Sequence, residues 1–215
     1  MRKFKTIILL LCGIVFGLAA FPVFAQKEPS INIKPLQDFA ALLKIKLERK
    51  EIDLDKSFKL VLEGVLDENG KIDRQKSQFT FAEGDEKMID LAQSGIDAVS
   101  DSGYLTYLRA LGVEQIKLTG AQDNETFSAQ IESEQKDENK ANTAVSGVNL
   151  MIQSIVLLSE KDIKKLSEDE MTIIKAFQAK TDGKNFVLNF ALPKNTFHEI
   201  LLRNIKVSEN NKTVG

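Results

Sequence analysis

The chain of 215 residues contains one histidine, His198, and one cysteine, Cys12. A Ser–His–acid triad would need His198 as its base. Because His198 lies beside Phe197 and Glu199 in a segment with helical periodicity, we expect a surface histidine rather than a catalytic one. One histidine cannot build a typical zinc site, and the sequence has neither a G-x-G-x-x-G motif nor a P-loop. We therefore predict no catalytic residue, no metal site and no cofactor.

Acidic residues are numerous, so a pair of carboxylates of the glycosidase type is the remaining catalytic alternative. The densest acidic group, Glu168 to Glu170, follows directly after Ser167. Ser-x-x-Glu is the pattern of a capping box, and acids in a first helical turn interact favourably with the positive end of the helix dipole. This group therefore indicates a helix start, and a secreted carboxylate-dependent hydrolase remains an alternative without assigned residues.

The segment from about residue 138 to residue 158 is the most apolar part of the chain outside its N-terminus. Its apolar residues would cover nearly the whole circumference of a helix, so we expect a core helix that is buried on all sides. In an alternative hypothesis, one side of this helix faces a ligand or a protein partner. That face would consist of Val148, Ile152 and Ile155.

The rest of the sequence alternates between two periodicities. A helical stripe over residues 36–47 comes first. Three pairs of period-two segments follow, with turns at Asn69–Gly70, Asp123–Asn124 and Asp182–Gly183, and helical periodicity follows each pair. This order predicts an α+β fold, in which three β-hairpins, each followed by helix, form an antiparallel sheet with its helices packed on one face.

The N-terminal 25 residues have the layout of a cleavable secretory signal. A basic start is followed by an apolar run over residues 7–21, and Val23 and Ala25 occupy the small-residue positions before Gln26. Cleavage after Ala25 would leave a polar tether over residues 26–35, a single domain over residues 36–207 and a polar tail over residues 208–215. An uncleaved anchor is the alternative, because residues 7–24 are about long enough to span a bilayer.

Removal of the signal changes the net charge and the cysteine content of the protein. Three of the 29 basic residues lie within it, so the exported chain carries 26 basic and 31 acidic residues, a net charge of −5. A mildly acidic chain without a basic block is not expected to bind nucleic acid. The loss of Cys12 leaves no thiol, so a core must hold the domain together without disulfides. We expect a periplasmic or secreted protein of a bacterial envelope, or an inner-membrane protein if residues 7–24 are retained.

The segment over residues 58–100 contains a strand, an acidic-Asn-Gly turn, a second strand and a helix. Its landmarks are Phe58–Leu62, Asp67–Ile72, Gln78–Phe81 and Gly84–Asp85. In this order it resembles the C-terminal domain of TonB-type energy transducers. The resemblance implies a membrane anchor and contact with an outer-membrane receptor.

These observations lead to one main hypothesis. We expect an exported, non-catalytic envelope protein that serves as a binding module for an envelope protein or for an apolar small molecule. A membrane-anchored TonB-like transducer and the secreted hydrolase are the alternatives.

N-terminal sequencing of the protein after expression of the full chain tests the export prediction. We expect the first residue to be Gln26, because signal peptidase reads the small residues before it. Recovery of an intact Met1 in the membrane fraction would contradict cleavage and favour the anchored alternative.

Overall fold

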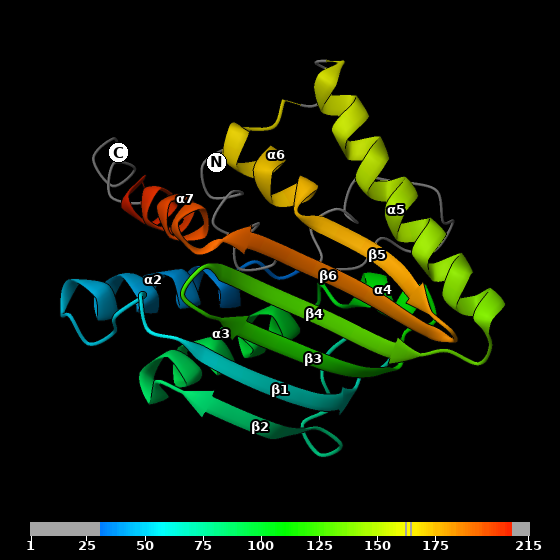
Figure 1. Cartoon of the computed structure of the whole chain (residues 1–215), viewed down its shortest axis with the longest axis horizontal. Coiled ribbons are helices and arrows are strands. Elements are labelled where there is room, and N and C mark those ends of the chain that lie inside the picture. The colour runs from blue at the N-terminus through cyan, green and yellow to red at the C-terminus, as the bar shows by residue number, and fades with distance from the viewer. Residues whose placement is uncertain (1–30, 162, 164, 208–215) are drawn as a thin grey trace.

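The computed structural model describes residues 31–161, 163 and 165–207 (Figure 1). The elements in chain order are α2 (Lys34–Glu48), β1 (Phe58–Val65), β2 (Gln78–Gly84), α3 (Glu86–Ser102), α4 (Thr106–Ala110), β3 (Gln115–Gln122), β4 (Thr126–Glu134), α5 (Glu138–Glu160), α6 (Glu168–Lys175), β5 (Phe177–Asp182), β6 (Asn185–Pro193) and α7 (Lys194–Val207). The predicted signal peptide, the predicted polar tail and residues 26–30 of the predicted tether lie outside the described residues.

The fold is α+β, as predicted, and its strands form one six-stranded sheet. The strand order is β2-β1-β3-β4-β6-β5, and all five neighbouring pairs are antiparallel. The turn chemistry expected between β3 and β4 is present, because Asp123 Oδ1 accepts the backbone N–H groups of Glu125 and Thr126, both at 2.7 Å. Gly183, in the β5–β6 turn, has φ 57°, a conformation that glycine adopts without strain.

One face of the sheet is apolar, and we call it the inner face. Its two central rows, read across the strands by register, are Leu60–Gly120–Ala129–Phe190–Phe177 and Leu62–Leu118–Ile131–Leu188–Ala179. Most of these residues belong to a single hydrophobic core together with residues of α2, α3, α5 and α7. In β4 and β6 the alternation of the sequence thus coincides with the two faces of the sheet.

The opposite face of the sheet is mainly polar, although Val61, Phe81 and Val187 also lie on it. One of its rows carries Glu63, Lys117 and Glu132, and the next carries Thr119, Gln130 and Asn189. In Figure 1 the strands pass in front of α3 and α4, and no described helix lies in front of the strands. This face is consequently open to solvent over the described part of the chain.

The helix α2 has the predicted stripe. Leu36, Phe39, Ala40 and Leu43 are buried, and the helix packs mainly against α3. It starts at Lys34, two residues before the expected position, with a proline in its first turn where proline is well tolerated.

The connection between β1 and β2 is longer than the predicted tight hairpin at Asn69–Gly70. Two successive turns fill it, because Asp67 Oδ1 accepts the N–H of Asn69 and Asp73 Oδ1 accepts the N–H of Gln75. These Asx turns each reverse the chain locally, so the second strand begins only at Gln78.

The expectation that the long apolar helix is buried on all sides is wrong. In α5, Val148 and Ile155 are buried, but the side chains of Leu150 and Leu157 are 66% and 50% exposed. The helix contacts β5 and β6 along one side only, and in Figure 1 its C-terminal half rises away from the strands. By length and composition α5 could cross a membrane. However, its residue Asn149 donates a hydrogen bond to the backbone oxygen of Ala179, so that part of the helix belongs to this domain.

Two nearby substitutions test the placement of α5. Ile155→Ala should lower the free energy of unfolding by about 2–5 kcal/mol, because it leaves a cavity in the core. Leu157→Ala should change it by less than about 0.5 kcal/mol, because that side chain is half exposed. Urea unfolding of both variants measures the difference, and equal losses would contradict this orientation of the helix.

Candidate functional site

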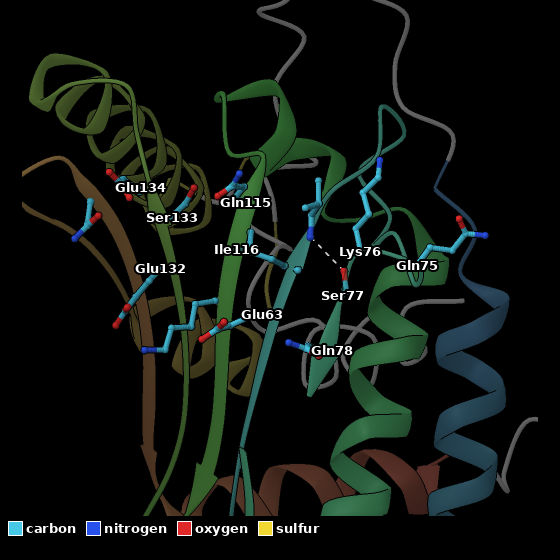
Figure 2. A pocket seen from close by; sticks show the side chains of 14 residues that line it. Glu63, Gln75, Lys76, Ser77, Gln78, Gln115, Ile116, Glu132, Ser133 and Glu134 are labelled. Carbon is cyan, nitrogen blue, oxygen red and sulfur yellow. Dashed lines mark hydrogen bonds between the residues drawn. The ribbon is translucent and has the colours of Figure 1, made fainter. Parts of the chain in front are cut away.

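The described residues form two hollows of different chemistry. The larger, about 620 Å³, lies where β1, β3 and β4 approach the loop before β2 (Figure 2). Glu63, Glu132 and Gln115 line it, and Ser77 Oγ accepts the backbone N–H of Val65 at its centre.

The charged side chains of this polar hollow alternate in sign. Lys117 is paired by register with Glu63 on β1 and with Glu132 on β4. Cross-strand pairs of opposite charge stabilise neighbouring strands on a solvated sheet face. Strand pairing is therefore sufficient to explain these residues, and we place the candidate site in the second hollow.

The second hollow is an apolar cavity of about 140 Å³ between the inner face and the helices α2, α3 and α7. Its aromatic and aliphatic lining includes Phe39, Phe58, Met88, Phe127 and Leu201. The rings of Phe127 on β4 and Phe197 on α7 stack with their centroids 3.7 Å apart, which fixes α7 over one end of the cavity. Half-buried lining residues such as Leu54 and Ile96 bring the cavity close to the surface.

Small residues inside regular elements create this space. Gly120 lies within β3, and a Cβ atom placed on it would meet only Leu60 Cγ, at 3.9 Å, an ordinary contact. Gly64 on β1 differs, because a Cβ there would lie 2.4 Å from Ser77 Oγ. Neither the backbone conformation nor a close neighbour therefore requires glycine at position 120. Since glycine within a strand is unfavourable and often marks the close approach of another group, Gly120 is a signal for a ligand.

The cavity has two polar side chains in its lining, Gln122 and His198, and they bond to each other. Gln122 Nε2 donates to the backbone oxygens of Leu54 and Lys56, at 2.6 and 2.9 Å. This fixes the amide so that its oxygen accepts a hydrogen bond from His198 Nε2, at 2.9 Å. Gln122 thus joins β3, α7 and the segment before β1.

The expectation that His198 is a surface residue is wrong. The residue is only 9% exposed, because α7 turns this side chain inward beside Phe197. Burial lowers the pKa of His198 below its ordinary value, against the opposing effect of Asp55, whose carboxylate lies 3.8 Å from Nδ1. The ring is therefore held in its neutral form, with the hydrogen on Nε2.

The three residues of α5 that were predicted to form a ligand or partner face lie outside the apolar cavity. Val148 and Ile155 are buried, Ile152 is half-buried, and none of the three lines the apolar cavity. Sequence reasoning missed Gly120 and Gln122. A glycine and an uncharged polar residue on the inward side of an alternating strand were the available signals.

Within the described chain, no group of three His, Cys, Asp or Glu residues is arranged to hold a metal ion. The chain matches no protein-family model, no curated protein and no solved structure. The resemblance of residues 58–100 to TonB-type transducers accordingly stays a prediction.

The buried histidine predicts a specific dependence of stability on pH. Below pH 6.5 the unfolded chain binds a proton at His198 more readily than the folded chain does, so stability should fall as the pH falls through that range. Asp73 and Asp123 have pKa values below their usual range because backbone N–H groups donate to them, and they should not contribute above pH 5.

Urea unfolding at pH 7.5 and pH 5.5 measures this loss. In His198→Gln the difference between the two pH values should be smaller than in the unaltered protein. An unchanged difference would show that another group titrates.

Proposed function

We propose that the protein is an exported, non-catalytic binding protein of a bacterial envelope that holds a small apolar ligand in the cavity beneath Gly120. The observation that carries the proposal is the glycine itself. It lies in β3, one of the two central strands of the sheet, where an added Cβ atom would meet no steric obstacle and where glycine weakens a strand. The absence of a side chain there is most simply explained by a ligand that uses the space.

Other observations support the same cavity. Gly95, within α3, also lines it, but the close approach of Phe39 Cζ, 3.3 Å from an added Cβ atom, accounts for this glycine. Ala92 and Ala129 add two more small side chains to the lining. The cavity lies between a sheet and its helices, a frequent place for small-molecule sites, and its apolar lining with few polar groups is typical of such sites.

We further propose that three hairpin–helix units are the architectural basis of this binding module, with the helices on one face. The pairing of β1 with β2, β3 with β4 and β5 with β6 supports this description, as does the single core that joins the sheet to α2, α3, α5 and α7. In such an arrangement the first two units and α7 enclose the ligand, and the third unit extends the sheet.

The variant Gly120→Val tests the proposal, with toluene as the probe. The unaltered protein should bind toluene saturably and shift the amide resonance of Gly120. The valine methyl groups occupy the cavity, so the affinity should fall at least about tenfold, equivalent to about 1.4 kcal/mol. Stability should rise by roughly 0.5–1 kcal/mol, because a glycine within a strand is replaced.

Thr119→Val is the matched control, since the adjacent residue points to the opposite face of the sheet. Its affinity for toluene should equal that of the unaltered protein. Mass spectrometry of a solvent extract should find an apolar small molecule with the purified protein and less of it with Gly120→Val. The absence of both saturable toluene binding and an extracted molecule would contradict the proposed function.

A further inference from the structure

The polar end of the apolar cavity has no hydrogen-bond donor left for a ligand. Both amide hydrogens of Gln122 go to backbone oxygens, those of Leu54 and Lys56. The Nε2 hydrogen of His198 goes to the side-chain oxygen of Gln122. A ligand oxygen that entered this end of the cavity would therefore meet no free N–H group.

The second nitrogen of His198 does not change this conclusion. Nδ1 lies 3.8 Å from the carboxylate of Asp55, whose side chain is 73% exposed, and Lys194 Nζ lies 3.4 Å from the same carboxylate. This side of the ring thus faces charged groups at the surface.

The remainder of the lining is hydrocarbon. Apart from Gln122 and His198, the residues that line the cavity have apolar side chains or are glycines. Arg109 Nε is the one buried side-chain nitrogen or oxygen among the described residues that has no hydrogen-bond partner. Arg109 does not line the cavity. No unsatisfied polar side-chain atom is therefore present to recognise a polar group.

We infer that the part of the ligand inside the cavity is a hydrocarbon group without a hydrogen-bonding atom, and that any polar part of the ligand stays outside. This inference rests on the proposed function and defines its ligand class. An engineered apolar cavity of about 150 Å³ binds benzene, so the volume of about 140 Å³ suits a single ring or a short alkyl segment.

Toluene and phenol test the inference, because a methyl group in one replaces a hydroxyl group in the other at similar size. Burial of a hydroxyl without a good partner is unfavourable, so phenol should bind at least about tenfold more weakly than toluene. Equal or tighter binding of phenol would overturn the inference while leaving the proposed function intact. If neither compound binds saturably, the proposed function itself fails.

A second variant tests the inference through an expected increase in the relative affinity for phenol. In His198→Leu the oxygen of Gln122 loses the donor that it now accepts from, so both of its lone pairs are open to a phenol hydroxyl. The ratio of phenol to toluene affinity should rise at least about fivefold over that of the unaltered protein, whereas the control Thr119→Val should leave it unchanged. An unchanged ratio in a folded His198→Leu protein, checked by circular dichroism, would contradict the role assigned to this hydrogen bond.

Discussion

The structure depends on the need to cover one apolar face of an antiparallel sheet. Six strands satisfy each other's backbone hydrogen bonds, but the inner rows around Leu60, Ile131 and Phe190 would remain in water without the helices. Burial of apolar surface is the dominant favourable term in folding, so the helices are held mainly by this face. Their amphipathic stripes, such as that of α2, follow from the same requirement.

The packing between the inner face of the sheet and its helices is not uniform. Two regions differ in the size of the side chains that they contain. In one region, the side chains of Ile131 on β4 and Phe186 on β6 are fully buried. In the other, Gly120 on β3 and Ala129 on β4 line a cavity. The tightly packed region contributes stability that the region around the cavity does not contribute. A cavity of this kind lowers the stability of the protein that contains it, and the packed region compensates for that loss.

The features predicted correctly from the sequence were those set by local periodicity. Period-two alternation predicted strands on both sides of the turn at Asp182–Gly183, and the Ser167–Glu170 capping box predicted the start of α6. The errors arose where distant segments decide the outcome. Whether Leu150 or His198 is buried depends on which residues of other elements pack beside them, and periodicity within one helix does not contain that information. The cavity could not be predicted from the sequence for the same reason, because its lining comes from β1, β3, β4, α2, α3 and α7.

The side chain of Gln122 has a consequence for the order of folding. It bonds to backbone oxygens 68 and 66 residues earlier in the chain and to a histidine 76 residues later. Contacts between residues so far apart form slowly, because a long loop must close before each of them is made. Hairpins such as β5–β6, joined by a short turn, involve only local closure and can form early. The part of the cavity lining around Gln122 is therefore expected to be among the last parts of the domain to assemble, so that the formed cavity would mark the completion of folding.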